Sequence, residues 1–594
     1  MFKTNNIRNF SVIAHIDHGK STLSNCLIKF CNNKNYLDNI NIIDNIYLEQ
    51  ERGITIKAQS INLTYNFFGV NYKLNLIDTP GHTDFSYEVI RALSACEGVL
   101  LLIDAIKGIE AQTVNNFYIA KNMNLFTIVV INKIDLLESK PINLINQIKN
   151  ILDKNLIITC CSAKKSMGIS NLIKNIIEFI PPPINYYNDK LQAIIIDAQF
   201  HKYLGIMLLI RIKSGFILKK DKIKLVNINN TYIVKKIWLV TPKIKECSVL
   251  NCGEVGWIIC NIKNFKQPIV GSTIISEKDV NNAILPIKKV NPQIFVSLFL
   301  LNNSNYNIFS NALTKISLSD ASLSYKPEFS NTFGNGFRCG FLGLLHMDII
   351  KTRLEREYKL ELVITLPTVK YEVLTNNNKI IYINKPYQLL ALNKIRELRE
   401  PIAECFIVTP RIYVSKIIKL CIKKRGIQVS IIYFNDQVKI TYFIPLIEVI
   451  LDLSTIIKSI SHGYASLDYN FKYFKKSKLS CVNIYINKKL IPELSVILHN
   501  NDIRYKTNLI INKLTEIIPR HQFNVIIQAV INNKVIARTT IKRLCKKVTE
   551  KCYGGDVSRK KKLLNKQKDG KKKLQKLGKI NIPKKVFFSL LNIN

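Results

Sequence analysis

AHIDHGKST, residues 14–22, follows directly on an apolar run and decides the fold of the first part of this 594-residue chain. The run NFSVIAHI (9–16) is rich in Ile and Val, which predicts a buried strand. Ala14–Ser21 fits the phosphate-loop pattern with Ala at the first glycine position. In such a loop, backbone N–H groups and a helix start converge on a β-phosphate. We therefore expect a strand–loop–helix unit that binds a nucleotide.

The side chains of this loop have separate expected tasks. Lys20 should reach the β- and γ-phosphates, and the Ser21 hydroxyl should ligate Mg²⁺. A plain glycine turn between a strand and a helix is the alternative for the loop taken alone. The residues expected around the phosphates are Asp17, His18, Gly19, Lys20, Ser21 and Thr22.

LNLIDTPGH (74–82) is a second apolar run that ends in polar residues. Asp78 at its end suits a place beside Mg²⁺, bound through water. The backbone N–H of Gly81 would sense a γ-phosphate. The stretch thus predicts a strand that delivers acidic and backbone groups to the same phosphates.

Two further motifs point to the base. TIVVINKID (127–135) predicts a buried strand, and CSAKK (161–165) follows another one. A carboxylate at Asp135 can accept hydrogen bonds from guanine N1–H and its amino group, where adenine has no donors. The Ala163 N–H would meet guanine O6. The expected base-binding residues are Asn132, Lys133, Ile134, Asp135, Ser162, Ala163 and Lys164.

These four motifs occur in order, and each lies at the carboxyl end of a predicted strand. That edge is where α/β sheets bind ligands. The arrangement excludes a set of unrelated turns, and it predicts GTP or GDP with Mg²⁺ as the ligand.

Positive charge is distributed unevenly along the chain, whose formal net charge is +44. Residues 1–183 hold 18 Lys and Arg against 15 Asp and Glu, and the remainder holds 68 against 27. A biased genome rich in Lys, Asn and Ile codons would explain part of this excess. Since such a bias acts on the whole chain, we also expect a polyanionic partner for the later domains.

Cysteine usage and hydropathy bear on the compartment. The 14 cysteines include no CxxC pair and no His at metal spacing, which predicts reduced thiols in the cytoplasm. No stretch reaches the roughly 18 apolar residues that cross a bilayer. These features predict a soluble cytoplasmic protein.

Strand-like and helix-like patterns divide the rest of the chain. IPPPINYY (180–187) predicts a stiff linker, and short β-runs across 188–285 predict a small barrel. The apolar stripe of FRCGFLGLLHMDIIKTRLEREY (337–358) predicts a helix in which His346 is structural. A strand–helix–strand unit follows from residue 397, and residues 481–594 predict a separate basic domain.

RGITI (52–56) resembles switch I of the translational GTPases, and the His of DTPGH is also typical of that family. The resemblance implies that Thr55 ligates Mg²⁺ while the γ-phosphate is present. It also implies that His82 positions the attacking water, with Ile16 and Ile54 as an apolar gate. Asp17 matches a position that holds a monovalent cation in the family.

KCYGGDVSRKKKLL (551–564), IAECF (402–406) and SHGYASLDYNF (461–471) resemble the elongation factor 4 (LepA) family. Elongation factor G has an insert in its first domain and a fourth domain, and this chain has no room for either. Three positions depart from the family pattern, namely Gln50, Asn335 and His462, and none belongs to the expected nucleotide site.

The resemblance implies a multidomain α/β and β protein. The expected order is a P-loop GTPase domain (1–183), a β-barrel domain (184–287), a ferredoxin-like domain (288–370), a second ferredoxin-like α+β domain similar to domain V of elongation factor G (371–480) and a basic C-terminal α+β domain (481–594).

The same resemblance implies a monomeric, ribosome-dependent GTPase of translation elongation. It would promote back-translocation of tRNAs by one codon as a fidelity factor under stress, and contact ribosomal RNA and tRNA through its basic C-terminal domains. Two alternatives stay open: a GTP-latched assembly or RNA-binding factor, and another translational GTPase such as elongation factor G or the BipA-like group.

The lysine-rich end of the chain has three interpretations. Lys542–Lys585 contains 18 Lys and Arg against 3 Asp and Glu. A solvated tail, a patch on the inner face of the cell membrane and a grip on RNA phosphates all fit such a run. Gly554 and Gly555 would let a phosphate approach the backbone, which favours RNA.

Overall fold

The structure is a computed structural model. It describes residues 4–32, 47–52, 55, 57–137, 139, 141–184, 190–201, 203–226, 228–241, 243–262, 270–277, 291–301, 305–330, 333–391, 395–434, 437–532, 534–544, 548–549 and 557–577. The expectations for Ile54, Gly554 and Gly555 lie outside the described residues.

The first unit is a six-stranded sheet in the order β2-β3-β1-β4-β5-β6. All its pairs are parallel except β2–β3, and β1 is buried along its whole length, as expected for a sheet covered on both faces. The strands are β1 (Ile7–Ala14), β2 (Gln59–Phe67), β3 (Val70–Asp78), β4 (Gly98–Asp104), β5 (Phe126–Asn132) and β6 (Ile157–Cys160).

Helices flank this sheet, and their apolar residues complete two cores with its two faces. They are α1 (Lys20–Asn32), α3 (Ser86–Ser94), α4 (Ala111–Asn122), α5 (Pro141–Ile151) and α6 (Ile169–Phe179), with the short α2 (Tyr47–Arg52) before β2. Both apolar faces of the sheet are thereby removed from water, and its polar carboxyl edge is left for ligands.

The second unit is a small barrel. Its strands follow the order β10-β15-β7-β8-β14-β11-β12, and the additional pairing of β10 with β11 closes the sheet. The strands are β7 (Gln192–His201), β8 (Gly205–Ser214), β10 (Lys222–Leu225), β11 (Ile228–Thr241), β12 (Lys243–Cys247), β14 (Val255–Cys260) and β15 (Thr273–Ser276), with the pair β9 (Phe216–Leu218) and β13 (Val249–Asn251) beside them.

The third unit has the ferredoxin-like order β17-β18-β16-β19, with β20 also paired to β16. Its elements are β16 (Ile294–Leu300), α7 (Tyr306–Ser319), β17 (Ser324–Ser330), β18 (Gly334–Phe341), α8 (Leu344–Tyr358), β19 (Leu362–Ile364) and β20 (Thr368–Val369). The helix predicted over 337–358 was wrong in its first part. That part lies in β18, because pairing with β16 and β17 outweighs the local apolar spacing.

The fourth unit repeats this order as β26-β23-β25-β24 and carries a hairpin of β21 and β22 on β23. Its elements are β21 (Tyr371–Thr375), β22 (Ile380–Ile383), β23 (Ile395–Pro410), α9 (Val414–Lys423), β24 (Ile427–Phe434), β25 (Gln437–Pro445), α10 (Leu446–Glu448), α11 (Ser454–Ile460) and β26 (Ser466–Lys476). The third and fourth units share one large apolar core.

The fifth unit is a sheet with one packed helix and one helix that leaves the body. Its elements are β27 (Leu479–Ile486), β28 (Lys489–Leu490), β29 (Val496–His499), α12 (Ile503–Ile517), β30 (Val525–Ile531), β31 (Lys534–Ile541) and α13 (Val557–Leu577). Phe299 and Val363 of the third unit take part in its core. The fifth unit is therefore joined to the body by apolar packing.

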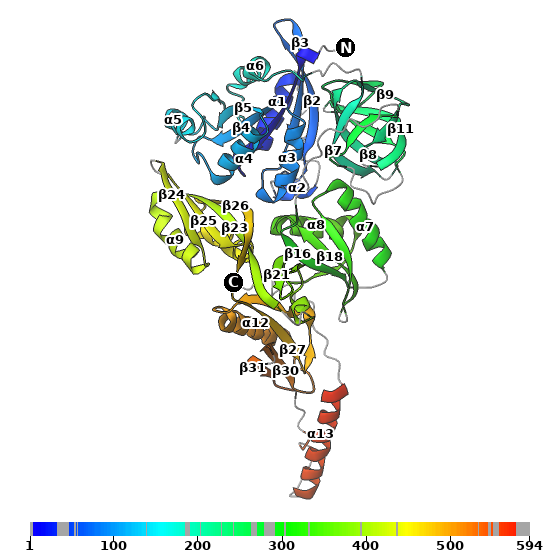
Figure 1. The fold of residues 1–594 in the computed structure, drawn as a ribbon, viewed down its shortest axis with the longest axis vertical. Helices are drawn as coiled ribbons and strands as arrows, with labels where there is room; N and C mark the ends of the chain where they lie inside the picture. The colour runs from blue at the N-terminus through cyan, green and yellow to red at the C-terminus, as the bar shows by residue number, and fades with distance from the viewer. Residues whose placement is uncertain are drawn as a thin grey trace.

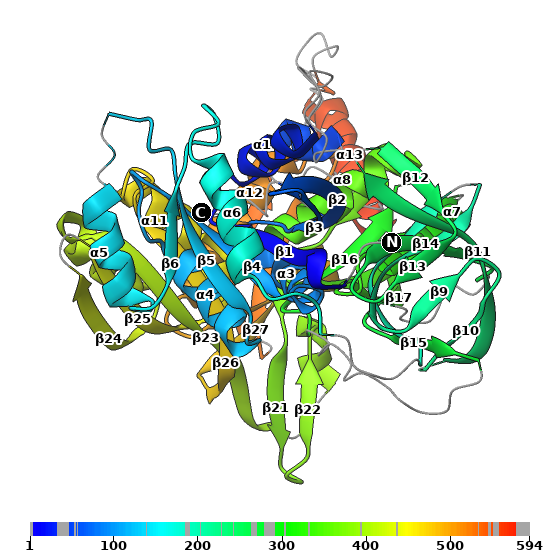
Figure 2. The same ribbon diagram turned by 90° about the horizontal axis from the view of Figure 1, so that it is seen from above.

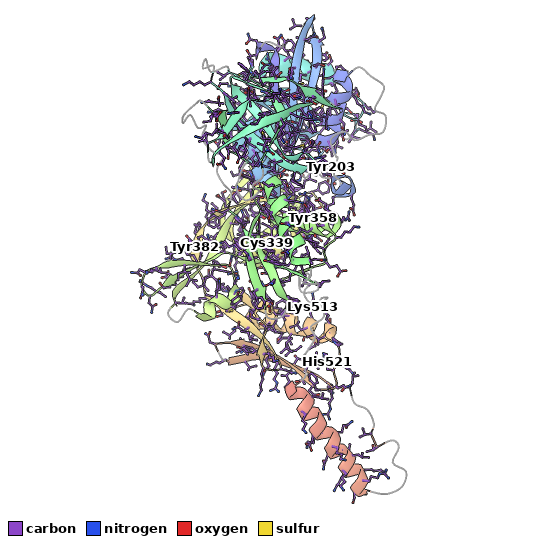
Figure 3. The ribbon with its side chains drawn as sticks, turned by 90° about the vertical axis from the view of Figure 1, so that its right-hand side faces the viewer. Tyr203, Cys339, Tyr358, Tyr382, Lys513 and His521 are labelled. Carbon is purple, nitrogen blue, oxygen red and sulfur yellow. The ribbon has the colours of Figure 1, made fainter. Side chains whose placement is uncertain are left out.

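The whole molecule is elongated (Figure 1). The first unit lies at one end with the barrel beside it, the third and fourth units follow, and α13 projects at the opposite end (Figure 1). The described side chains of α13 point away from the helix axis (Figure 3). The β21–β22 hairpin also projects from the body (Figure 2). Among the described residues no helix combines the length and apolar character needed to cross a membrane.

Buried charge fixes the barrel against the first unit. Lys73 on β3 forms an ion pair of 2.6 Å with Glu254 of the barrel, and both side chains are buried. Lys57 and Asp197 form a second pair at 2.9 Å. The guanidinium of Arg211 on β8 contacts Glu97 in the first unit. Because these charges have lost water, each depends on its partner.

We expect Lys73→Met to lower the free energy of unfolding by about 3 kcal/mol, because Glu254 would stay buried without its partner. Both tryptophans of the chain, Trp238 and Trp257, lie in the barrel, so urea unfolding followed by their fluorescence measures this change. The matched control is Lys219→Met, which removes an exposed pair with Glu246 and should change the free energy by less than about 1 kcal/mol. Equal effects of the two substitutions would contradict the prediction.

Candidate nucleotide-binding site

The phosphate loop connects β1, which ends at Ala14, to α1, which begins at Lys20. Gly19 has a φ of +91°, and a Cβ at this position would lie 2.6 Å from Nδ2 of Asn132. That amide donates a hydrogen bond to the carbonyl of His18 at 3.0 Å. Gly19 is therefore required twice, by the backbone angle and by the close approach of Asn132.

Lys20 and Asp78 form the buried charge pair of the site. Their Nζ and Oδ2 atoms are 2.9 Å apart, and Lys20 also donates to the carbonyl of Thr79. The other carboxylate oxygen of Asp78 accepts the Ser24 hydroxyl at 3.2 Å. The side chain of Thr79 donates to the Val12 carbonyl at 2.7 Å. Strand β3 and helix α1 are thus joined across the loop by satisfied polar groups.

Two hydroxyl groups converge beside this pair. Ser21 Oγ lies 3.4 Å from Thr55 Oγ1, and Thr55 is buried. Asp78 is fully buried close by. Hydroxyl and carboxylate oxygens are the hard ligands that Mg²⁺ takes in proteins, so this set of donors fits the ion expected from the sequence.

The base motifs meet at the ends of β5 and β6. Oδ1 of Asn132 accepts the Ala163 N–H at 3.0 Å, and the Ser162 hydroxyl donates to Asp135 at 2.8 Å. This hydrogen bond lowers the pKa of Asp135, so the carboxylate is ionised and remains an acceptor. Lys133 Nζ lies 2.7 Å from the Asp17 carbonyl and 2.7 Å from Asp104. The loops are held in one arrangement by these bonds.

His82 lies in the loop that follows β3. Its Nδ1 accepts the backbone N–H of Asp84 at 3.1 Å, and its side chain is 26% exposed. Burial lowers the pKa of His82, an effect that the Asp84 carboxylate opposes and that Lys458 and His15 reinforce. The carbonyl of the preceding Gly81 accepts the side-chain amide of Gln112. His82 is therefore a neutral imidazole near pH 7 whose Nδ1 is an acceptor.

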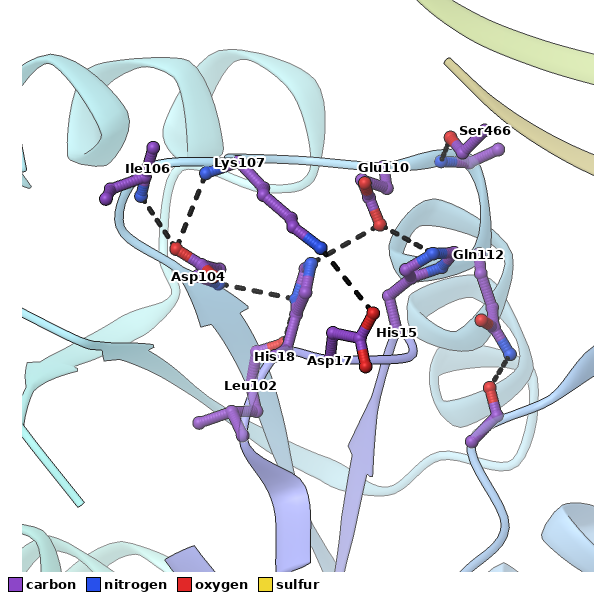
Figure 4. Close-up of polar contacts among 12 residues, drawn as sticks. His15, Asp17, His18, Leu102, Asp104, Ile106, Lys107, Glu110, Gln112 and Ser466 are labelled. Atoms are coloured by element: carbon purple, nitrogen blue, oxygen red, sulfur yellow. Dashed lines mark hydrogen bonds and ion pairs between the residues drawn. The ribbon is translucent and has the colours of Figure 1, made fainter. Parts of the chain in front are cut away.

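Sequence reasoning missed the start of α4, which adjoins this loop (Figure 4). Glu110 Oε2 lies 2.8 Å from Nε2 of His15 and 3.3 Å from Nε2 of His18. Burial would raise the pKa of Glu110, but the two histidines outweigh it and lower that pKa to about 2. A local signal for this segment did exist: Asp104 ends a buried strand at the same edge as the four motifs, so the residues that follow it were candidates for the site.

The start of α4 also reaches the fourth unit. The Ala111 N–H donates to the Ser466 hydroxyl at 2.9 Å (Figure 4). Asp468 of the same strand is buried, and burial raises its pKa to about 6. The segment that touches the phosphate loop and Gly81 thus also touches β26.

The described structure brings most of the expected residues together at one edge of the sheet. Thr22 and Lys164 are exposed, and the carboxylate of Asp17 points toward Lys107, with 3.9 Å between the charged atoms. The residues joined by the contacts above are Asp17, His18, Gly19, Lys20, Ser21, Thr55, Asp78, Gly81, Asn132, Lys133, Asp135, Ser162 and Ala163.

Comparison with known proteins gives three family matches. Residues 5–182 match the elongation factor Tu GTP binding domain. Residues 397–484 match the elongation factor G C-terminus, and residues 486–592 match the C-terminus of the GTP-binding protein LepA. A protein of known crystal structure from Thermus thermophilus shares the fold, with a TM-score of 0.60 at 14% identity, over 80% of this chain and 97% of that chain.

The first unit is thus a GTPase domain of the translation-factor class. The phosphate loop and base motifs predicted GTP, and the resemblance of RGITI and DTPGH predicted the class. Together the three matches cover more than half of the chain. Their combination indicates a LepA-type translational GTPase, and the chain belongs to this family. The expected multidomain α/β and β fold class is likewise confirmed.

We expect Gly19→Ala to weaken GDP binding at least about tenfold, or ~1.4 kcal/mol. The added Cβ would strain the backbone and displace Asn132. Fluorescence titration with a labelled GDP measures the dissociation constant. Gly69→Ala is the matched control, because Gly69 also has a positive φ, +81°, but its Cβ would meet nothing within 4 Å. If both variants bind GDP as the unsubstituted protein does, the close packing at Gly19 is not needed for binding.

Proposed function

We propose that the protein is a ribosome-dependent GTP hydrolase of translation elongation. The observation that supports this proposal is that the backbone just before His82 lies against the end of β1, where a Cβ at Gly81 would lie 3.5 Å from the Ala14 carbonyl oxygen, in a chain whose C-terminal segment matches LepA. The proposed domain limits are those expected from the sequence: 1–183, 184–287, 288–370, 371–480 and 481–594.

Guanine recognition rests on Asp135 and Ala163. The Asp135 carboxylate accepts from the N1–H and amino group of guanine, and the Ala163 N–H donates to O6. Asn132, just before Asp135 in the chain, accepts the Ala163 N–H and donates to the His18 carbonyl of the phosphate loop. Ser162 keeps the carboxylate in place and ionised. Adenine would leave that carboxylate unpaired, so it is rejected.

Phosphate binding rests on the loop from Asp17 to Thr22. Lys20 exchanges its contact with Asp78 for the β- and γ-phosphates, while the backbone N–H groups at the start of α1 face the β-phosphate. Ser21 and Thr55 would hold Mg²⁺ directly and Asp78 through water. The bound ion supplies charge neutralisation for the phosphates. The Asp17 position is proposed for a monovalent cation, and Lys107 already brings positive charge near it.

Hydrolysis rests on His82. Its Nδ1 is occupied by the Asp84 N–H, so Nε2 carries the proton of the neutral ring. That N–H can position the oxygen of an attacking water, and Gly81 senses the γ-phosphate through its own N–H. Phosphoryl transfer needs mainly positioning and charge stabilisation from the protein. Loss of the γ-phosphate releases Thr55 from Mg²⁺, and the RGITI segment (52–56) leaves its GTP-bound conformation.

The ribosome and its tRNA are the proposed partners of the basic later units. Helix α13 carries ten Lys and Arg and a single Asp, and it projects from the body (Figure 1). Compact ammonium groups attract phosphate without reading sequence. Following the family, the proposed outcome is a one-codon reverse movement of tRNAs on stalled or mis-translocated ribosomes.

Two alternatives are distinguished by experiment. In the first alternative, a GTP-latched ribosome assembly factor, GTP binding without hydrolysis would set the conformation and so control the affinity for RNA. On a membrane, α13 would lie on anionic lipid on the inner face of the cell membrane. Leu564 and Leu574 are each about half exposed on α13, at 49% and 42%, but no aromatic residue accompanies them. RNA is therefore favoured over lipid as the partner of α13. The protein is accordingly proposed to be cytoplasmic, and it is proposed to be a monomer.

We expect ribosomes to accelerate GTP hydrolysis strongly and His82→Ala to abolish most of this acceleration while GTP binding is retained. Single-turnover release of phosphate with and without ribosomes measures both effects. Lys121→Ala, on the outer face of α4, is the control. A His82→Ala variant that leaves the ribosome as fast as the unsubstituted protein would favour the latch.

We expect glutamine at Lys560, Lys561 and Lys562 to weaken ribosome binding and to reduce the slope of log affinity against log salt by as much as about 2. With these lysines replaced, binding releases fewer counterions from phosphate. Binding is measured by co-sedimentation at several salt concentrations. The matched control carries glutamine at the exposed Lys149, Lys154 and Lys174 of the first unit, and should bind with an unchanged slope.

A further inference from the structure

The side chain of Asp84 crosses from the first unit to the third. Its Oδ2 accepts the backbone N–H of Leu345 at 3.0 Å and that of His346 at 3.4 Å. These are N–H groups of the first turn of α8, which have no partner within the helix. The positive end of the helix dipole also favours a carboxylate there. Asp84 therefore acts as the cap of a helix that belongs to another unit.

Gly343 makes room for this contact. A Cβ at Gly343 would lie 2.0 to 2.1 Å from the three carboxyl-group atoms of Asp84. The backbone at Gly343 is extended, with φ −155° and ψ −179°, so other residues could adopt it. The glycine is thus required by the approach of Asp84 and not by its own conformation. The contact is built from both sides.

The same residue touches the histidine of the GTPase site. The backbone N–H of Asp84 donates to His82 Nδ1 at 3.1 Å, and its carboxylate oxygen lies 3.6 Å from that nitrogen. One residue therefore connects the imidazole to α8 through two bonds made by its main chain and its side chain. A shift of α8 would carry Asp84 and move or release His82.

The third unit holds its end of the contact rigidly. His346 Nε2 lies 2.7 Å from Asp320 Oδ2, and its Nδ1 accepts the Leu342 N–H at 3.2 Å. The Phe85 ring packs edge-on against His346, with 5.9 Å between ring centres. These contacts fix the loop before α8, so Asp84 meets a defined helix start.

Two other links between the units lie farther along α8. Arg52 of α2 pairs with Asp348 at 2.7 Å, and Glu51 pairs with Arg356 at 2.6 Å. Both pairs are partly or largely exposed, and neither touches His82. They are therefore suited to separate the loss of an inter-unit contact from the loss of the Asp84 contact.

We propose that Asp84 is a positioning residue for GTP hydrolysis, which ties the His82 imidazole to the start of α8 so that the placement of the third unit sets the histidine. The inference rests on the proposed role of His82. It goes further by naming the contact through which a neighbouring unit reaches the reaction. A change in the third unit would then alter hydrolysis without any change in nucleotide affinity.

Three variants test this contact. Asp84→Ala removes the carboxylate, Gly343→Ala pushes it away, and Asp84→Asn keeps an acceptor oxygen. We expect ribosome-stimulated single-turnover hydrolysis to slow about 100-fold in the first two, the cost of a misplaced catalytic group, with Asp84→Asn partly rescued. GDP affinity should stay unchanged in all three. Asp348→Asn, the matched control on α8, should hydrolyse GTP within about twofold of the unsubstituted protein.

The double variant Asp84→Ala with Gly343→Ala gives a sharper test. The three atoms nearest to a methyl at position 343 all belong to Asp84, so the double variant should be no slower than Asp84→Ala alone. Additive losses would mean that the two substitutions act through different contacts, and would overturn the proposal.

Titration of the His82 imidazole by ¹⁵N NMR gives a readout independent of activity, with His82→Ala assigning the signal. The charged groups that face His82 are Asp84, Lys458 of α11 and His15 of the phosphate loop. Without the Asp84 carboxylate, the pKa of His82 should fall in Asp84→Ala and in Asp84→Asn. It should stay constant in Asp348→Asn.

The outcomes are separable from those of the proposed function. If ribosomes do not stimulate the unsubstituted protein, or His82→Ala is as fast, the proposed function fails, and an unshifted His82 titration in the Asp84 variants then overturns the contact independently. If stimulation and the His82 effect are present but Asp84→Ala and Gly343→Ala hydrolyse normally, the positioning role is wrong. It is also wrong if Asp348→Asn slows hydrolysis as much as Asp84→Ala.

Discussion

The nucleotide site depends on two hydrogen bonds made by the side-chain amide of Asn132. Its Nδ2 donates to the His18 carbonyl and its Oδ1 accepts the Ala163 N–H. One buried amide thereby joins the loops that follow β1, β5 and β6. Because it is almost fully buried, each of these bonds replaces one to water, and losing either would leave a polar group unpaired. The close approach also explains why position 19 has no side chain.

Around this centre, the structure attaches neighbouring units to the loops that carry function. The barrel is held by buried ion pairs such as Lys73–Glu254, which give a fixed placement. The fourth unit reaches the start of α4 through Ser466, and the third reaches the His82 loop through α8. The Ser466 contact uses one hydrogen bond and the Asp84 contact uses two, and small shifts can break such bonds. The contrast suits a site with a fixed base pocket and an adjustable hydrolytic loop.

Much of the first unit could be predicted because its signals are local. The phosphate loop, the strand ends and the base motifs are short segments whose residue types carry the chemistry, and the structure places them at one edge. The apolar stripe over 337–358 misled in part, because its first residues pair as a strand with β16 and β17. The clustering of Glu110 with His15 and His18 was not foreseen, since it joins residues far apart in the chain.

By itself the sequence determined the nucleotide class, the family and the order of the units, because motifs and apolar periodicity act over a few residues. Only the tertiary structure decided what His82 and Asp84 touch. The start of α8 lies some 260 residues beyond Asp84 in the chain, and no local pattern announces which helix a carboxylate will cap. That pairing arises when two folded units pack together. The need for glycine at position 343 is therefore visible only in the packed structure, where Asp84 lies against it.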